Sequence, residues 1–382
     1  MRAPRRVVIT GMGSVSAGGI GGTASVARVL AATSASSIGP VRAFDTTGWP
    51  SRLGAEVDDA ALEALLDPAA ARRLSRICRL TVAACRLAVE DSGVARGPAL
   101  GLVVGTEHGD FRSSEEFVTG YLKRGPSGLS PMIFPNTVMN SMAAVAAIEI
   151  GARGPSVTVN QATVAGDLAV ARAATLVRDG RALAVVAGGV DELLAHVYRR
   201  LSEMGKLSPA AGRGTEGCRP YEPGHNGAVL GEGATFLVLE DLESARARGA
   251  VIHAEIRSAA SGNLPVAPHT APRGRRDPHS PALRALASMG AAPSAVTACY
   301  GSGNGDPALD DWELGLLAAD RVPAPISLAP RFGQHGGLGA LRVAAAALHD
   351  RGSMPTPASE LVMVHGLARG GCRTALLIDR AA

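Results

Sequence analysis

The stretch VTVNQATVAGDLAVARAATLVRDGRALAVVAGGVDE, from Val157 to Glu192, decides the fold. An apolar run, a turn of small residues, an alanine-rich segment and a second apolar run predict a strand, a turn, a buried helix and a strand. A turn of this kind usually presents a reactive side chain where the helix starts. This turn contains Gln161, Ala162, Thr163, Val164 and Ala165. The sequence therefore predicts the platform of a nucleophile without a strong nucleophile on it.

The composition indicates a large soluble chain. It has 382 residues, of which 46% are hydrophobic and 3% aromatic, a length that suits two fused halves or one large layered domain. No apolar run reaches the roughly 20 residues that a membrane helix needs, and the N-terminus MRAPRRVVITG enters a strand without a signal-peptide pattern. Five scattered cysteines favour reduced thiols over disulfides or a zinc site. We expect a cytoplasmic protein with no membrane partner and no metal.

The net charge of +4 is mild, and its one dense basic run is RGRR at 273–276. This run lies in a stretch rich in Pro, Gly, His and Arg (259–282), which predicts a loop. A nucleic-acid surface would combine a basic stripe with aromatic residues, which are scarce here. We expect no nucleic-acid partner. A solvated basic loop and a contact for an acidic protein remain the two interpretations of the run.

Strands and helices alternate along the chain, which predicts the α/β class. RRVVITG (5–11) predicts a first strand, followed by a turn of small residues, GMGSVSAGG (11–19). That turn lacks the third glycine and the following acidic residue of a dinucleotide loop, so we expect no nucleotide cofactor. Residues 73–93 have the spacing of an amphipathic helix that ends at Gly93. Residues 233–249 predict a strand and then a short helix that ends at Gly249.

An internal repeat links two alanine-rich segments. GDLAVARAATLVRDG begins at Gly166 and GALRVAAAALHDRG begins at Gly339, and six positions match at a constant offset of 173 residues. Chance similarity between two alanine-rich helices is one explanation. The other is a duplicated α/β unit with one central buried helix in each copy.

Several blocks resemble the β-ketoacyl synthase family. They are the opening RRVVITGMGSVSAGG, the RGPSVTVN that leads into the turn, the VVAGGVDE that follows it, and RPYEPGHNGAVLGEGATFLVLEDLESARARGA (219–250). The resemblance covers nearly the whole chain. It implies the thiolase fold, a duplicated five-layer α/β/α/β/α sandwich, with halves at 1–249 and 250–382. It also implies that two central helices direct their N-termini at the active site, where they stabilise negative charge.

Active members of that family use a cysteine and two histidines, and each position departs here. The resemblance places Thr163 at the cysteine, and a threonine hydroxyl is a poor acyl acceptor without an adjacent base. The first histidine falls on Tyr300, or on Ser302 if Asp310 and Glu313 are taken as anchors. The second falls on Gln334.

Other positions also bear on the comparison with active members of the family. Ala329 replaces the lysine that precedes the second histidine, while His335 lies one place beyond Gln334, so a shifted alignment would restore an imidazole. Arg369 replaces the phenylalanine of the C-terminal loop in LARGGCRTALLI (367–378). Cys299 is the best reserve nucleophile, although a buried structural cysteine is the commoner case.

The loss of all three groups together resembles one branch of the family, the chain length factor or ketosynthase β-subunit of bacterial type II polyketide synthases. The resemblance implies a subunit without catalytic residues that pairs with an active ketosynthase, receives chains on acyl carrier protein, and shapes the tunnel that sets polyketide length. Such subunits often carry Gln at the nucleophile position. Thr163 departs from that, with Gln161 two residues earlier, which indicates an unusual branch such as one serving polyene or highly reducing systems. The alternatives are an enzyme of altered chemistry, either a decarboxylase or an acyltransferase, and a stand-alone acyl-binding homodimer.

The resemblance also implies where the partner and the tunnel lie. The apolar strand SVTV and the segment NTVMNSMAAVAAIEIG (136–151) predict a large apolar subunit interface. The tunnel candidates follow the strand GLVVGTEHG, follow GGVDE, or lie near the two-fold axis. They are Asp110, Ser113, Phe117, Phe134, Tyr198 and Leu201. For Phe117 and Leu201, a plain core role is the alternative.

Overall fold

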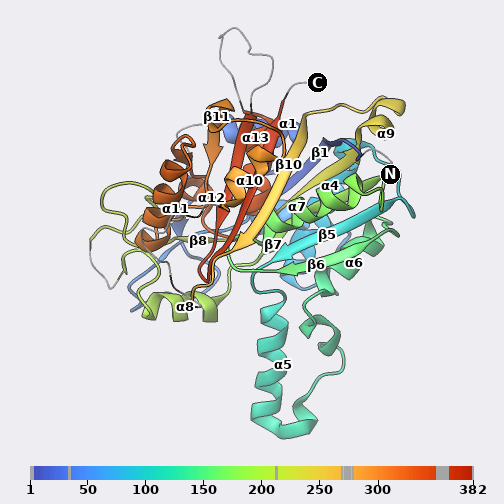
Figure 1. Cartoon of the computed structure of the whole chain (residues 1–382). Helices are drawn as coiled ribbons and strands as arrows, with labels where there is room; N and C mark the ends of the chain where they lie inside the picture. Colours follow the sequence, from blue (N-terminus) through green and yellow to red (C-terminus); the bar gives the residue numbers. More distant parts are fainter. Residues whose placement is uncertain are drawn as a thin grey trace.

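The computed structural model describes residues 4–32, 36–210, 214–267, 270, 277, 279–349 and 361–380. Its main sheet contains two units of five strands with the same internal order (Figure 1). The first unit is β1 (Val7–Ser16), β9 (Gly233–Asp241), β7 (Ala184–Asp191), β5 (Leu100–Thr106) and β6 (Ser156–Asn160). The second unit is β10 (Ala254–Asn263), β14 (Cys372–Asp379), β13 (Leu361–Leu367), β11 (Val296–Tyr300) and β12 (Pro325–Ile326).

The strand directions repeat as well as the order. In each unit the first three strands are antiparallel to their neighbours and the last three are parallel. The units join through an antiparallel pairing of β1 with β10, at Val8 and Glu255. The division into halves at 1–249 and 250–382 stays a prediction.

Alternation along the strands produces layers, because successive side chains point to opposite faces. On β5, Val103 packs in the central core with α7 (Ala165–Arg178) and α13 (Leu338–Ala347), while Leu102 and Val104 pack in an outer core. That outer core contains α4 (Arg76–Ser92) and α6 (Ser141–Glu149). The second unit likewise packs one face on α7 and α13 and the other on α10 (Pro281–Ala287) and α11 (Pro307–Ala319). Five layers result.

The matched glycines of the internal repeat lie where the two central helices meet. A Cβ on Gly166 would be 2.6 Å from the carbonyl oxygen of Gly336, and one on Gly339 would be 2.6 Å from the amide nitrogen of Asp167. Neither position has room for a side chain. The repeat therefore marks a real close approach of the N-terminal ends of α7 and α13.

The expected turn at 11–19 is wrong, because β1 continues to Ser16. Its glycines serve close packing against α4. A Cβ on Gly11 would be 2.5 Å from the side chain of Ser92, and one on Gly13 would be 2.2 Å from the carbonyl oxygen of Ala84. Small residues in a strand here reflect a helix lying close above it.

Other expected boundaries hold or shift slightly. The helix predicted at 73–93 is α4, which ends at Gly93 in a left-handed conformation with φ 63°. The strand and short helix predicted at 233–249 are β9 and α9 (Leu242–Ala247). The loop predicted from 259 is wrong at its start, because β10 pairs with β14 as far as Asn263. The RGRR run at 273–276 lies outside the described residues.

Apart from α5, the remaining elements are short. They are β2 (Gly19–Gly22), α1 (Thr23–Ala31), β3 (Gly39–Pro40), β4 (Leu53–Ala55), α2 (Asp59–Glu63), α3 (Pro68–Ala71), α5 (Phe111–Arg124), the 3₁₀ turns η1 (Gly125–Gly128), η2 (Phe134–Thr137) and η4 (Pro293–Ala295), α8 (Ala195–Glu203), β8 (Leu230–Gly231) and α12 (Ala329–Phe332). In the described part of the chain, no helix has the length and apolar character needed to cross a membrane.

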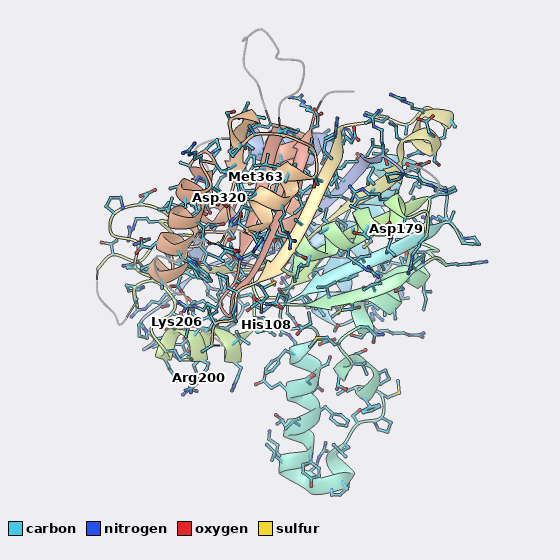
Figure 2. The ribbon with its side chains drawn as sticks, in the orientation of Figure 1. His108, Asp179, Arg200, Lys206, Asp320 and Met363 are labelled. Atoms are coloured by element: carbon cyan, nitrogen blue, oxygen red, sulfur yellow. The ribbon has the colours of Figure 1, made fainter. Side chains whose placement is uncertain are left out.

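One helix stands away from the body. α5 projects from it, and η1 and η2 lie on the chain that leads back (Figure 1). Figure 2 places His108 where this projection leaves the body. Large apolar side chains on the projection face solvent, including Leu122 at 76% exposure and Met132 at 85%. An exposed apolar surface of this kind is typical of a binding surface.

Candidate functional site

A cavity of about 340 Å³ opens where the parallel strands β5, β6 and β7 end. Ligands of α/β proteins commonly bind at the carboxyl ends of parallel strands. Apolar side chains from 193–207 and 228–230 form much of its wall. The polar lining comes from 107–108, 163, 191–192, 304–306, 334–335 and 369. The cavity therefore combines residues from both halves of the chain.

Thr163 lies in the turn between β6 and α7 and lines the cavity. Its φ is 61°, a left-handed conformation that is rare for a β-branched residue. Strain of this kind concentrates at functional sites. The sharp turn of a nucleophile platform is thus present, as the sequence predicts, while the residue on it is a threonine.

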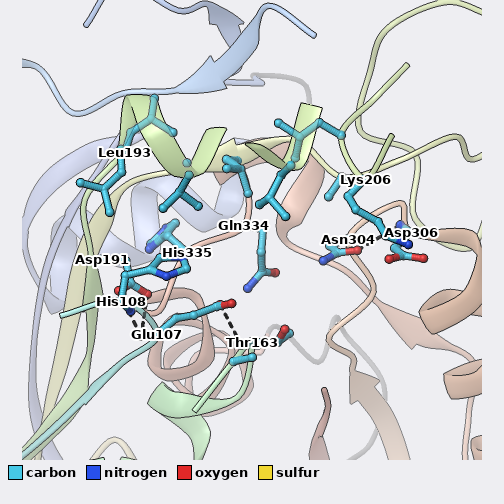
Figure 3. Close-up of a pocket in the computed structure, with 18 of the residues that line it drawn as sticks. Glu107, His108, Thr163, Asp191, Leu193, Lys206, Asn304, Asp306, Gln334 and His335 are labelled. Atoms are coloured by element: carbon cyan, nitrogen blue, oxygen red, sulfur yellow. Dashed lines mark hydrogen bonds between the residues drawn. The ribbon is translucent and has the colours of Figure 1, made fainter. Parts of the chain in front are cut away.

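The amide N–H of Thr163 is already occupied. It donates to the Glu107 carboxylate, with 3.0 Å between the amide nitrogen and Oε2 (Figure 3). Burial raises the pKa of the Glu107 carboxyl above its ordinary value; nearby His108 lowers it and Asp191 raises it. Glu107 immediately follows the β5 strand, so the contact joins two neighbouring strand ends.

Asp191, at the end of β7, fixes the loop that carries Glu107. Its carboxylate accepts hydrogen bonds from the Thr106 hydroxyl at 2.7 Å and from the amide of His108 at 3.1 Å, and it also accepts from the amide of Glu107. On its other oxygen it accepts from the amide of Gly336 at 2.9 Å. One buried carboxylate therefore holds the loop after β5 and the loop before α13 together.

Gln334 and His335 lie side by side in the cavity wall. Gln334 is 7% exposed, and neither its amide oxygen nor its amide nitrogen has a hydrogen-bond partner among the described residues. Burial lowers the pKa of His335 to about 4, so its imidazole is neutral at pH 7. Its Nδ1 accepts from the amide of Gly337 at 3.1 Å. The structure thus places Gln334 in the cavity beside Thr163 and Glu107 (Figure 3).

Charged and polar groups form another side of the cavity. Arg369 forms an ion pair with Asp306, with 3.0 Å from Nε to Oδ2. Lys206 extends toward Asn304 and Asp306 (Figure 3). Arg369 thus stands where the resemblance expects the phenylalanine of the C-terminal loop, and it is held by a carboxylate of the first histidine motif.

The two alignments of the first histidine place residues with different hydrogen-bond partners at that position. The Tyr300 hydroxyl lies 2.9 Å from Nδ1 of His349 and does not line the cavity. Ser302 donates from its amide and its hydroxyl to Glu313, at 3.1 and 3.0 Å. Ser302 does not line the cavity either, whereas Asn304 and Asp306 beyond it do, so both alignments stay open. Neither alignment supplies an imidazole.

Cys299 does not act as a reserve nucleophile in this arrangement. Its side chain is fully buried in the outer core with α10 and does not line the cavity. Burial raises the pKa of its thiol, so the thiol stays protonated. Its role is packing.

The tunnel candidates divide into separate groups. Tyr198 is fully buried against the rings of Phe44 and Trp49, and its hydroxyl donates to the carbonyl oxygen of Leu53 at 2.9 Å. The structure therefore assigns it to packing and not to a tunnel wall. Leu201 does line the cavity.

The other four candidates belong to the base and flank of α5. The Asp110 carboxylate caps α5 by accepting from the amide of Ser113 at 3.0 Å, and both residues are buried away from the cavity. Phe117 and Phe134 lie farther along the projection, with 5.7 Å between their ring centroids. Phe117 is half-buried and belongs to none of the core clusters.

Sequence reasoning missed Glu107, Asp191 and Lys206, which all line the cavity. It also missed the buried ion pair between Asp167 on α7 and Arg342 on α13, whose Nη2 donates to both carboxylate oxygens at 2.8 and 2.7 Å. A signal existed for Glu107, because a charged residue directly after an apolar parallel strand points to a site. The ion pair has no comparable local signal.

The comparisons with known proteins agree with this architecture. The N-terminal domain of β-ketoacyl synthase matches residues 4–245. The chain belongs to the β-ketoacyl synthase family. Among its relatives, 3-oxoacyl-[acyl-carrier-protein] synthase 2 of Synechocystis is 33% identical over 257 residues, covering 66% of this chain and 61% of the relative. The protein of the same name from Staphylococcus aureus is 31% identical over 267 residues, covering 67% of this chain and 62% of the relative. The chain therefore spans about three fifths of the length of these curated relatives.

Solved structures match this family member over its full length. The ishigamide ketosynthase/chain length factor superposes with a TM-score of 0.86 at 25% identity, covering 100% of both chains. A β-ketoacyl synthase from Burkholderia phymatum has a TM-score of 0.81 at 24% identity, covering 99% of this chain and 100% of that one. A type II PKS ketosynthase complex with its acyl-carrier protein has a TM-score of 0.81 at 20% identity, with the same coverage. The predicted thiolase-like α/β fold is confirmed.

Proposed function

We propose that this chain is a non-catalytic subunit, a chain length factor, that pairs with an active ketosynthase and shapes its acyl tunnel in the cytoplasm. The observation that carries the proposal is the nucleophile turn itself. It keeps its strained geometry, yet it presents Thr163 and commits the Thr163 N–H to Glu107. Acyl transfer needs both an activated nucleophile and free donors for the developing oxyanion. This chain offers neither at that position.

The lack of an acid–base group at the expected positions supports the same conclusion. Gln334 stands at the second histidine position, and Ser302 or Tyr300 stands at the first. His335 is neutral and already accepts from the amide of Gly337, and among the described residues it forms no hydrogen bond with Thr163. A decarboxylase or acyltransferase would need a base hydrogen-bonded to the Thr163 hydroxyl. Among the described residues the contact with Glu107 is through the Thr163 amide instead, so these alternatives are less well supported.

An exposed sheet edge with apolar side chains beside it supports the pairing with a partner subunit. Among the described residues, β6 ends the sheet and pairs only with β5, so its outer edge offers free backbone groups. Next to it, α6 exposes Ile148 at 83%, and the projection carrying α5 exposes further apolar side chains. An obligate interface buries such surface, typically about 2,000 Å² or more in total.

The partner that fits is an active ketosynthase. The neighbour with the TM-score of 0.86 is a ketosynthase/chain length factor, and another is a ketosynthase in complex with its acyl-carrier protein. By analogy, a chain carried on acyl carrier protein would be extended at the partner's site, with α5 and its Phe117 bordering the path. Whether the product is a polyene or another highly reduced polyketide stays a prediction.

Sedimentation tests the pairing. This chain is mixed with a candidate catalytic ketosynthase, for instance the product of an adjacent gene, and the proposal predicts a single 1:1 species. A stable homodimer that ignores every ketosynthase offered supports the acyl-binding homodimer instead. A monodisperse monomer contradicts both.

A further inference from the structure

The contact between Glu107 and Thr163 lies outside the hydrophobic core clusters that hold the sheet and the central helices. Glu107 follows β5 and Thr163 follows β6, and their contact lies in the cavity wall (Figure 3). The Glu107 carboxylate accepts from the Thr163 amide at 3.0 Å, just before α7 starts at Ala165. The carboxylate therefore sits at the positive end of a buried 14-residue helix.

This is the position that an oxyanion takes in acyl transfer. In such enzymes, the N–H of the nucleophilic residue itself is one donor to the negative oxygen of the tetrahedral intermediate. We propose that Glu107 closes the acyl site of this chain, because its carboxylate occupies the place of the oxyanion. The inference rests on the proposed function in treating the site as non-condensing. It adds that the missing cysteine is one of two independent barriers.

The loop carrying Glu107 is held in place by Asp191. That carboxylate binds the amides of Glu107 and His108 and the hydroxyl of Thr106, and it also binds the amide of Gly336. Swinging Glu107 away as a whole loop would break several buried hydrogen bonds. Asp191 thus fixes the backbone that carries Glu107, while the carboxylate itself is held by its hydrogen bond with the Thr163 amide.

The proposal predicts that restoring the nucleophile alone is insufficient. In a Thr163→Cys variant, the thiolate would attack a thioester carbonyl, form a new carbon–sulfur bond and release the original thiol, which takes up the proton that the cysteine lost. The negative charge on Glu107 raises the pKa of the new thiol. Its hydrogen bond also denies the carbonyl oxygen a donor, and losing one such donor slows acyl transfer about 10²–10³-fold.

The experiment compares four variants: Thr163→Cys alone, and Thr163→Cys combined with Glu107→Ala, Glu107→Gln or Glu192→Gln. The Gln replacement at 107 removes the charge but leaves an amide oxygen that can still accept from the amide of residue 163. Glu192→Gln is the matched control, because Glu192 lines the same cavity and has no contact with Thr163. Each variant is given a hexanoyl thioester of N-acetylcysteamine, and acylation is followed by intact mass, with the wild-type chain as background for the native cysteines. The rate of alkylation by iodoacetamide against pH reports the pKa of the new thiol.

We expect acylation of the Glu107→Ala combination at least about 100-fold faster than that of Thr163→Cys alone. The Glu107→Gln combination should show a lowered thiol pKa but slow acylation, and the Glu192→Gln combination should behave like Thr163→Cys alone. Equal acylation of Thr163→Cys with and without Glu107→Ala overturns the inference. The inference is also overturned if iodoacetamide alkylates every variant but the thioester acylates none of them. These results leave the proposed function intact, whereas an acyl adduct on wild-type Thr163 would overturn the function itself.

A second measurement avoids the cysteine. With Thr163 retained, Glu107→Ala should speed hydrogen exchange of the Thr163 amide by at least about tenfold, since its acceptor is gone, while amides on the far side of α7 keep their rates. An unchanged exchange rate at Thr163 contradicts the inference.

Discussion

The buried ion pair between Arg342 and Asp167 provides the sharpest test of how the two halves are held together. Arg342 is 1% exposed and Asp167 is 0% exposed, and the guanidinium reaches both carboxylate oxygens within 2.8 Å. The pair joins the central helix of one half to that of the other. Replacing Arg342 by Met removes the charge but keeps much of the apolar side-chain volume, so the change isolates the electrostatic contribution.

Removing one partner of a buried pair costs about 3–5 kcal/mol, because the other charge is left uncompensated. Asp167 lies in the first turn of α7, where the helix dipole offsets part of that cost, by up to about 2 kcal/mol in buried geometries. We therefore expect Arg342→Met to lower the free energy of unfolding by about 3 kcal/mol. The double variant Arg342→Met with Asp167→Asn should regain about 2 kcal/mol, because the stranded carboxylate is gone.

Urea unfolding of the wild type, both single variants and the double variant measures these differences, provided that the denaturant dependence is the same in all four. The double-mutant cycle then gives the coupling between the two side chains. A loss below about 1 kcal/mol in Arg342→Met, or additive effects in the double variant, would refute the electrostatic account of this contact.

Two further predictions concern the tunnel and the cavity. Phe117→Ala should lengthen the products of the assembled complex by one or more two-carbon units, with little change in melting temperature because Phe117 lies outside the core. If the products are unchanged and the complex is destabilised by about 3–5 kcal/mol, as for a core phenylalanine, Phe117 is not a tunnel residue. The pKa of His335 is about 4 in the folded protein and roughly 6.5 in the unfolded chain. Between those pH values only the unfolded chain binds this proton, so the free energy of unfolding decreases as the pH falls through that window. His335→Leu should remove up to about 3 kcal/mol of this acid sensitivity, measured as a shallower fall of melting temperature from pH 7 to 4; equal slopes in the two proteins would argue against it.

Local sequence patterns predict a helix or strand well where residues within that element determine its structure. The apolar spacing at 73–93 and the final Gly93 were enough to define α4, because a left-handed residue ends the helix there. The repeat between Gly166 and Gly339 also pointed to the correct central helices. Both signals depend on residues near one another in the chain or on a direct copy of a segment.

Side-chain environments were harder to predict, because they depend on residues that are distant in sequence. Its position in the sequence predicts Tyr198 as a tunnel residue, yet Phe44 and Trp49, more than a hundred residues away in the chain, enclose its ring. The contact of Glu107 with Thr163 joins the ends of two different strands. Residue spacing in the sequence does not reveal the strand order and register that bring these residues together.

The first histidine motif shows how the environment of a residue depends on contacts that spacing does not reveal. Spacing alone allowed Tyr300 or Ser302, since a glycine follows each of them. The bonds from Ser302 to Glu313 and from the amide of Asn304 to Asp310 fix the loop, and the hydroxyl of Tyr300 points to His349 instead. Hydrogen bonds to two buried carboxylates thus fix the loop from which Asn304 and Asp306 reach the cavity.

Turnover of the reconstituted complex, with the nucleophile removed from one subunit at a time, tests the central claim most directly. We predict that Thr163→Ala leaves condensation within a few-fold of wild type, because no covalent step uses Thr163, whereas removing the catalytic cysteine of the partner ketosynthase abolishes product. Loss of turnover in Thr163→Ala with the partner intact, or product made by this chain alone, would contradict the claim.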